Sequence, residues 1–255
     1  MPDLPSSSQR PLTQRVKHEL RRRELTVTEV QPLTPSMVRI VLSGDDLQGF
    51  ISASPDDHVK LFFEEPGGEV MMRDFTPRIH DAAAGTLAID FVLHEGGPAG
   101  NFAASAKPGD QLKIGGPRGS LVVSDRVKRW LLVGDETALP AIARRMAEFG
   151  TDVQASVIIA VQGRAEEQAL PTAATVQVDW VHRPVTWADD PTPVVDALKR
   201  FNLAPETFAW VGAEAKVAKA VRRHLLEDRA HPREWMKAAG YWVIGEPGAH
   251  QPLDD

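Results

Sequence analysis

Residues 73–78 (RDFTPR) bring two cations, an aromatic ring and a hydroxyl within six positions. A guanidinium presents paired donors that match a phosphate, so Arg73 and Arg78 are candidates to bind an anion. In an extended segment Arg73 and Phe75 would share one face, and Thr76 and Arg78 the other. The same residues also fit a solvated strand end, so by themselves they leave both interpretations open.

A second candidate anion site lies near residue 98. Gly96 and Gly97 precede Pro98, and an alanine-rich run follows until Pro108. Proline in the first turn and proline after the end are typical of a helix, so we expect a helix to begin at Pro98. The free backbone N–H groups of a helix start attract anions. An ordinary glycine-rich turn before a helix explains the same pattern.

Residues 134–140 (GDETALP) follow an apolar run, residues 130–133, that is typical of a strand buried on both faces. In an open parallel sheet, ligands bind at the carboxyl ends of strands, and this segment would lie there. It lacks the GxGxxG pattern, and Asp135 or Thr137 would also serve as a helix cap. Residues 115–120 (GGPRGS) lack the Lys-Ser/Thr ending of a phosphate-binding loop, which favours a structural turn.

The chain shows two different patterns of predicted strands and helices, which indicate two domains that would position these segments. From Leu25 to about residue 123, short apolar and β-branched runs alternate with Pro, Gly and Asp, which favours an antiparallel barrel. Beyond residue 126, strand-like runs alternate with helical ones, as in βαβ units around a parallel sheet. Residues 15–24 fit a short helix or a solvated arm. We therefore expect four parts: a flexible arm (1–23), a β-barrel domain (24–124), an α/β domain (125–245) and a flexible tail (246–255).

The composition excludes several classes of function. The chain has 255 residues, no cysteine and a net charge of −6. Without cysteine there are no disulfides, thiolate metal sites, cysteine-ligated iron–sulfur clusters or cysteine nucleophiles, and this absence fits the cytoplasm. The acidic balance argues against a nucleic-acid partner. No apolar run approaches the roughly 20 residues that span a bilayer, and the histidines show no metal-ligand spacing.

Taken in order, these segments resemble the siderophore-interacting protein family, a branch of the ferredoxin-reductase-like flavoproteins. The resemblance spans roughly residues 24–245. Each segment is common alone, but seven in register across both domains are specific. The seven segments are residues 73–78 (RDFTPR), 90–94 (DFVLH), 97–99 (GPA), 108–110 (PGD), 116–120 (GPRGS), 134–140 (GDETALP) and 240–242 (GYW).

The resemblance implies a two-domain β plus α/β fold, with an antiparallel FAD-binding β-barrel, a capping helix and a C-terminal parallel-sheet NAD(P)H-binding domain. It implies an oxidoreductase that reduces ferric siderophores. NADH or NADPH would give a hydride to FAD, which would pass single electrons to Fe(III), so that weakly held Fe(II) is released for cellular iron uptake. We expect a cytoplasmic monomer that binds no nucleic acid, inserts in no membrane and has no metal site of its own.

The resemblance also implies roles for individual residues. The family's Arg-x-Tyr-Thr motif falls on Arg73, Phe75 and Thr76, so Arg73 would pair with a flavin phosphate and Phe75 would pack on the flavin. Thr76 would lie near its redox-active edge, and no residue need act as a general acid or base. Phe75 stands where tyrosine is usual, so a phenolic hydrogen bond is lost. The expected cofactor-binding residues are Arg73, Phe75, Thr76, Arg78, Asp90, Val92, His94, Gly97, Pro98, Ala99, Ser120, Asp135, Thr137, Ala138, Tyr241 and Trp242.

The substrate and the electron donor are less constrained. Many relatives carry a basic residue just after Gly-Tyr-Trp, whereas Val243 and Ile244 follow here, which favours a less charged siderophore such as a hydroxamate. The sequence does not separate NADH from NADPH, because Arg164 fits either a 2′-phosphate contact or a surface position. Two alternatives stay open: a flavin reductase with a separate protein partner, and a non-enzymatic siderophore- or flavin-binding protein.

Overall fold

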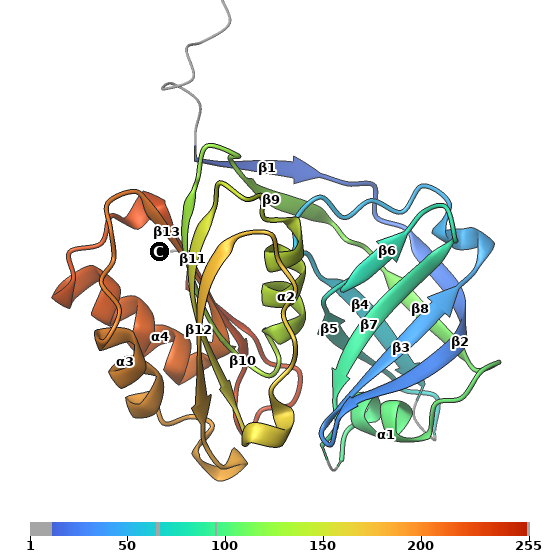
Figure 1. Ribbon diagram of the computed structural model, residues 1–255. Coiled ribbons are helices and arrows are strands. Elements are labelled where there is room, and N and C mark those ends of the chain that lie inside the picture. The colour runs from blue at the N-terminus through green and yellow to red at the C-terminus, as the bar shows by residue number, and fades with distance from the viewer. Residues whose placement is uncertain (1–11, 65–66, 95, 254–255) are drawn as a thin grey trace, which may run out of the picture.

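The computed structural model describes residues 12–64, 67–94 and 96–253. These residues form two lobes that lie side by side, a β-barrel lobe and an α/β lobe (Figure 1). The expected combination of an antiparallel barrel with a parallel-sheet unit is confirmed. Helix α2 (Leu139–Glu148) lies between the parallel sheet and the barrel.

The barrel lobe is a seven-stranded antiparallel sheet in the order β5-β4-β8-β2-β3-β7-β6. Its strands alternate between buried and more exposed residues, so one face of each strand packs into the barrel core. The helix expected at Pro98 is α1 (Pro98–Ser105), and it packs against β4 and β7. The strands are β2 (Arg22–Thr34), β3 (Met37–Ser43), β4 (Val59–Glu64), β5 (Val70–Phe75), β6 (Ile79–Asp81), β7 (Thr86–Val92) and β8 (Gln111–Gly115), with a 3₁₀ turn at Asp45–Leu47.

The α/β lobe is a six-stranded sheet in the order β12-β11-β10-β13-β14-β15. The first five strands are parallel, and β15 is antiparallel to β14. The strands are β10 (Arg129–Asp135), β11 (Gln154–Val161), β12 (Thr175–His182), β13 (Thr207–Glu214), β14 (Met236–Trp242) and β15 (Gln251–Pro252).

Helices cover both faces of this sheet. Helix α2 packs on one face, while α3 (Thr192–Lys199) and α4 (Ala215–Arg223) pack on the other. Strand β13 is buried along its whole length, as expected for a central parallel strand. Short helical segments complete the lobe: 3₁₀ turns η3 (Arg164–Glu166), η4 (Val185–Trp187) and η6 (Arg233–Trp235), and a π-helical turn η5 (His224–Asp228).

The strand order reverses between β10 and β13. From β10 the chain moves outward to β11 and β12, and then returns to the other side of β10 to form β13. Such a reversal opens a crevice at the carboxyl ends of the two strands, here at Asp135 and Glu214. Gly134 keeps this end of the sheet tightly packed, because a Cβ there would lie 2.8 Å from Ile142 of α2.

Two segments outside the expected domains are ordered by strand pairing. Residues Thr13–Lys17 form β1, which pairs with β9 (Gly119–Val123), so the short helix considered for residues 15–24 is not formed. Few apolar residues occur there, and the backbone of β9 supplies the hydrogen bonds instead. Strand β15, in the tail expected to be flexible, pairs with β14. Residues 1–11 and 254–255 lie outside the described residues.

The two lobes are joined by side-chain contacts from the α/β lobe. Arg144 of α2 donates to Ser52 Oγ and O, each at 2.8 Å, and to Pro77 O at 2.9 Å. Glu166 of η3 accepts from the Thr34 hydroxyl and from the Ser36 backbone N–H. These contacts fix the orientation of the parallel sheet relative to the barrel.

Candidate functional site

Arg73 and Phe75 lie on the core side of β5, the edge strand of the barrel sheet. Arg73 is paired with Leu61 and Phe75 with Val59, and both β4 residues are fully buried. The side-by-side placement expected from strand alternation is therefore present. The ring centroid of Phe75 lies 4.5 Å from that of Phe91. Because no strand of the described residues pairs with the outer side of β5, Arg73 and Phe75 are at an open margin of the barrel.

The Arg73 guanidinium has only a local hydrogen bond in the described part of the chain. Its Nη1 donates to Met72 O at 2.8 Å, and no carboxylate pairs with it there. Gly248, from the other end of the sequence, packs against it. A guanidinium in this state retains donors for an anionic ligand.

The start of α1 has the properties of an anion site. Gly97, with φ of 79°, is its N-cap residue, no side chain of the described residues caps the helix, and its first turn holds no acidic residue. The first N–H groups therefore lack capping partners. His94 lies against this turn, since a Cβ at Gly100 would come within 2.6 Å of His94 O. His94, Gly97, Pro98 and Ala99 are thus brought together.

Helix α1 connects to β5 through a chain of tilted aromatic rings. The centroids of Phe91 and Phe102 are 6.1 Å apart, and Phe91 is the ring that contacts Phe75. Residue Phe75 of β5 and helix α1 are thus linked through the barrel core. In Figure 1, α1 lies at the same end of the molecule as the carboxyl ends of β10 and β12.

Arg78 lies in a different contact from Arg73. Arg39 Nε donates to Asp90 Oδ1 at 2.6 Å and Arg39 Nη2 donates to Asp90 Oδ2 at 2.8 Å. Arg78 Nε lies 3.9 Å from Asp90 Oδ2. Burial lowers the pKa of Arg78, partly offset by the Asp90 carboxylate. Thr76, between the two arginine contacts, is buried. The two arginines of residues 73–78 therefore lie in different environments. The Asp90 carboxylate is already paired with Arg39 within the barrel.

Asp135 organises the crevice at the strand reversal. Its Oδ1 accepts the Thr137 backbone N–H at 2.9 Å and the Thr137 hydroxyl at 2.6 Å. Its Oδ2 accepts the Glu214 backbone N–H at 2.8 Å and the Trp242 indole N–H at 2.9 Å. One buried carboxylate thus fixes the turn before α2, the end of β13 and the Trp242 ring. The start of α2 itself has no side-chain cap.

Glu214 and Glu136 add charge to this crevice, although neither was among the expected site residues. Glu214 is fully buried and caps α4 by accepting the backbone N–H groups of Lys216 and Val217. Glu136 pairs with the buried Arg183 at 2.8 Å. Burial and the neighbouring Asp135 raise the pKa of Glu136 to about 7, against the opposing effect of Arg183. In the sequence, the only feature that marks Glu136 or Glu214 is its position after an apolar run.

Val92 and Ala138 lie at the back of the crevice. Val92 and Glu136 line one small cavity between the lobes, with Met37 of β3. Ala138 is fully buried, and its backbone N–H donates to Asp135 O at 3.0 Å. The Ala138 side chain is therefore packed within the lobe, and only Val92 borders open space.

Ser120 and Tyr241 lie near the contact between the lobes. The buried Ser120 hydroxyl donates to Asp57 Oδ2 at 2.6 Å and accepts from the Ala53 backbone N–H at 3.1 Å, so it is used within the protein. The Tyr241 ring centroid lies 6.0 Å from that of Trp210. Burial raises the pKa of Tyr241, and nearby carboxylates raise it further.

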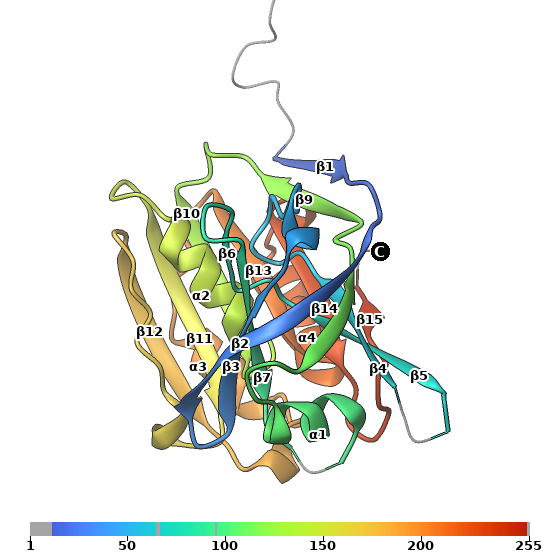
Figure 2. The same ribbon diagram turned by 90° about the vertical axis from the view of Figure 1, so that its right-hand side faces the viewer.

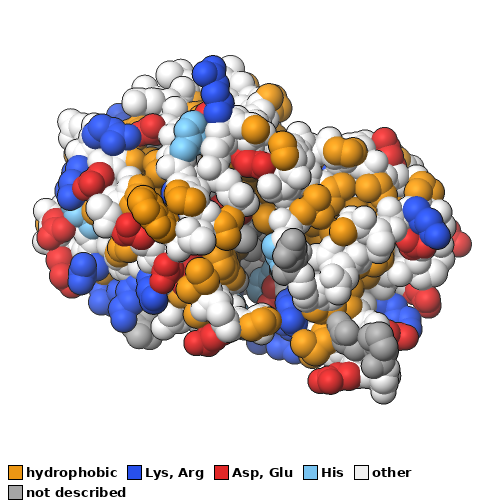
Figure 3. All heavy atoms as spheres, turned by 90° about the horizontal axis from the view of Figure 1, so that it is seen from below, with side chains coloured by type: hydrophobic (Ala, Val, Ile, Leu, Met, Phe, Trp, Pro, Cys, Tyr) orange, Lys and Arg blue, Asp and Glu red, His pale blue; other side chains and the backbone are white. Residues whose placement is uncertain are grey.

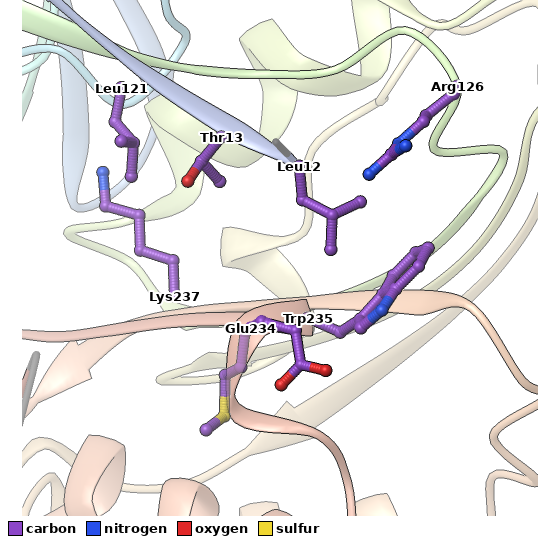
Figure 4. Close-up of a pocket in the computed structure, with 8 residues that line it drawn as sticks. Leu12, Thr13, Leu121, Arg126, Glu234, Trp235 and Lys237 are labelled. Atoms are coloured by element: carbon purple, nitrogen blue, oxygen red, sulfur yellow. The ribbon is translucent and has the colours of Figure 1, made fainter. Parts of the chain in front are cut away.

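The surface shows two separate hollows. Seen from the end that carries α1, a hollow lies between the lobes, with hydrophobic side chains on both sides (Figure 3). Another hollow, of about 540 Å³, lies at the opposite ends of the parallel strands, between Leu12, Trp235 and Lys237 (Figure 4). No expected site residue lines this second hollow, so the site chemistry belongs to the first. Within the described ranges there is no cluster of metal-ligating side chains and no helix able to cross a membrane.

Comparisons with known proteins agree with this geometry. The model of the siderophore-interacting protein family matches residues 127–245, and that of the siderophore-interacting FAD-binding domain matches residues 26–71 and 67–121. An NADPH-dependent ferric-chelate reductase of Escherichia coli is 35% identical over 251 residues, covering 90% of this chain and 96% of that protein. A ferric acinetobactin reductase of Acinetobacter baumannii is 26% identical, covering 87% and 78%. The crystal structure of a siderophore utilization protein from T. fusca superposes with a TM-score of 0.87 at 36% identity, covering 93% of this chain and 98% of that one.

Proposed function

The chain belongs to the siderophore-interacting protein family, and from this premise we propose that it is an FAD-dependent oxidoreductase that reduces ferric siderophores with NADH or NADPH. The observation that carries the proposal is the uncapped start of α1, a helix that is linked to Phe75 of β5 through the Phe102 and Phe91 rings. The α1 start and Arg73 suit the central pyrophosphate of a dinucleotide cofactor, and Phe75 suits a flat ring at one end of it.

The residues present fit FAD. The start of α1 follows two glycines and offers backbone N–H groups to a pyrophosphate. Arg73 has free donors for a phosphate oxygen. The half-buried ring of Phe75 at the open edge offers an aromatic surface to a flat ring. These three features support the assignment of Arg73, Phe75, His94, Gly97, Pro98 and Ala99 to FAD.

FAD, when bound, accepts a hydride from a nicotinamide and releases single electrons to Fe(III). The chain supplies binding and orientation. Asp135 holds the Trp242 indole in a fixed position at the crevice, and such a ring would cover a planar ligand and exclude water from it. The uncapped start of α2 beside Thr137 supports a site for the nicotinamide donor. No side chain in this arrangement is required to transfer a proton.

Ferric siderophore is the proposed substrate, held on the outer side of the crevice. Val243 and Ile244 follow Trp242 directly, and 37% of Ile244 is exposed. An apolar rim favours a ferric complex of low charge, such as a hydroxamate, because an anionic complex would lose hydration there without gaining a cation.

The division into a FAD domain (24–124) and a nicotinamide domain (125–245) is part of this proposal and is supported by the two family-model matches. We also propose that the protein is a monomer and that it acts in the cytoplasm, where the nicotinamide donor is produced and Fe(II) is used. Sedimentation of the FAD-loaded protein tests the monomeric state, and fractionation of cells tests the location.

The relay is tested by following the flavin spectrum of the FAD-loaded protein without oxygen. We expect bleaching on addition of NADPH or NADH, recovery on addition of a ferric hydroxamate, and Fe(II) captured by a chromogenic chelator. A flavin that neither nicotinamide bleaches would contradict the proposed donor. Bleaching without recovery, for hydroxamate and catecholate complexes alike, would indicate a protein acceptor instead.

A further inference from the structure

The chain turns back on itself after Trp242. In the C-terminal turn, defined here as residues 243–250, the Glu246 backbone N–H donates to Val243 O at 3.1 Å and the Ala249 N–H donates to Glu246 O at 3.1 Å. The chain then pairs with β14, with Gln251 opposite Gly240. Two turns and a strand pair thus give the C-terminal turn a defined shape.

The C-terminal turn contacts both lobes. On the α/β lobe, the Ile244 backbone N–H lies 3.4 Å from Glu214 Oε1 at the crevice. On the barrel lobe, Gly248 lies against Arg73 of β5. Figure 2 shows this C-terminal part of the chain, in red, beside β4 and β5. The turn therefore spans from the crevice to the cation proposed to bind the flavin phosphate.

The Arg73 guanidinium occupies the space that a side chain at Gly248 would need. A Cβ built at Gly248 would lie 3.0 Å from Arg73 Nη1, 3.3 Å from Cζ and 3.6 Å from Nε. Gly245, in the same turn, has nearly the same backbone angle, with φ of 79° against 78°, and a Cβ there would meet nothing within 4 Å. Only Gly248 therefore uses its missing side chain to let the guanidinium approach.

We propose that Gly248 is a positioning residue for cofactor binding, which holds the Arg73 guanidinium in the orientation that receives the flavin phosphate. This inference rests on the proposed role of Arg73. On an edge strand a free arginine samples many rotamers, and ordering it on binding lowers affinity. The C-terminal turn restricts the guanidinium on one side and the Met72 carbonyl holds Nη1, so the guanidinium has less freedom to lose when the ligand binds.

The pair Gly248→Ala and Gly245→Ala provides a matched test. Both substitutions introduce a Cβ at a positive φ, so both cost backbone strain, but only the first displaces Arg73. The readout is the dissociation constant of FAD, measured by titrating the apoprotein and following flavin fluorescence. We expect Gly248→Ala to weaken FAD binding about fivefold, as for a misaligned charge-assisted hydrogen bond, and Gly245→Ala to leave it within about twofold of the wild type.

A double-mutant cycle separates this inference from the proposed function. If Gly248 acts through Arg73, the Arg73→Ala/Gly248→Ala protein will bind FAD no more weakly than Arg73→Ala alone. Additive losses, or equal losses for the two glycine variants, would overturn the positioning role. If Arg73→Ala itself binds FAD as the wild type does, the failure lies in the role proposed for Arg73. The thermal midpoint of each apoprotein, matched between the two glycine variants, excludes a difference in folding.

Discussion

The indole N–H of Trp242 donates a 2.9 Å hydrogen bond to Asp135 Oδ2 and so links the ends of two strands that are not neighbours. Strand β13 lies between them in the sheet, and its last residue, Glu214, gives its backbone N–H to the same oxygen. A single carboxylate thus holds three strand ends at the point where the strand order reverses. The proposed nicotinamide site is formed by atoms whose positions depend on it.

Substitution Asp135→Asn should destabilise the fold and release the Trp242 ring. The amide replaces one acceptor oxygen by a donor that faces other donors, so about 2–4 kcal/mol of unfolding free energy should be lost. Denaturant unfolding measures the loss, and the tryptophan emission of the native state should shift to longer wavelength. Asp189→Asn, which weakens only an exposed pair with Lys216, should change stability by less than about 1 kcal/mol. Equal effects of the two substitutions would refute a central role for Asp135.

A second prediction concerns Asp56, a buried carboxylate at the contact between the lobes. Burial alone would raise its pKa, but the Lys237 ammonium and hydrogen bonds from Ser54 and Trp210 lower the pKa from 3.8 to about 2. A depressed carboxyl pKa stabilises the fold at neutral pH, and this contribution of about 2 kcal/mol should be lost as the pH falls from about 4 towards 2.

Lys237→Met tests this account, because it removes the cation and leaves Asp56 buried. We expect a loss of about 3 kcal/mol or more at pH 7. Burial then raises the pKa of Asp56. The difference in unfolding free energy between the variant and the wild type should therefore narrow as the pH falls from 7 towards 5. Stability is measured by urea unfolding at each pH, with Lys113→Met, on an exposed pair with Glu64, as the control. A difference in unfolding free energy that stays constant with pH would show that Lys237 acts by packing alone.

Glu136 should make stability depend on pH in the opposite sense. Its pKa is raised from 4.5 to about 7 by burial and by Asp135, so the folded state binds a proton more tightly than the unfolded chain. Stability should therefore fall as the pH rises from about 4.5 to 7. Glu136→Gln resembles the protonated form and can still accept from Arg183. We expect it to match the wild type near pH 4 and to be more stable above pH 8, as measured by calorimetry.

Glu148→Gln, at an exposed position on α2, serves as the control for Glu136 and should leave the pH profile unchanged. A Glu136→Gln protein that is less stable than the wild type at pH 8 would show that the ionised pair with Arg183 is favourable. In that case the raised pKa would be wrong.

Local signals predicted much of the fold. The helix start at Pro98 and the shared face of Arg73 and Phe75 follow from residues within a few positions, and both are present. The contacts of Asp135 could not be predicted in this way, because Trp242 is 107 positions away and nothing in either neighbourhood marks the partner. Strand β1 was missed for the same reason, since its polar residues form a strand only because β9 offers a free edge.

The same limit applies to charged residues. Asp90 was expected to contact the cofactor, and its position in a strand was predictable, but the bidentate bond from Arg39 depends on the β3–β7 register. Segment resemblance identifies which residues recur in a family and does not show which partner each one has. Residues that work through long-range contacts, such as Arg144, therefore gave no signal.

Arg144 leads to the last prediction, that a residue of the α/β lobe controls cofactor binding in the barrel. Its guanidinium donates to Pro77 O, and Pro77 directly follows Thr76 in the motif that carries Arg73 and Phe75. Arg144→Met should free this carbonyl and let the motif move, which should weaken FAD binding about tenfold, the equivalent of ~1.4 kcal/mol. Glu148→Gln weakens the ion pairs of Glu148 with Arg144 and Arg145 and leaves the bonds of Arg144 to Ser52 and Pro77, so its FAD affinity should equal that of the wild type. Flavin fluorescence titration measures both, and unchanged affinity in Arg144→Met would show that the barrel holds the motif without help from the α/β lobe.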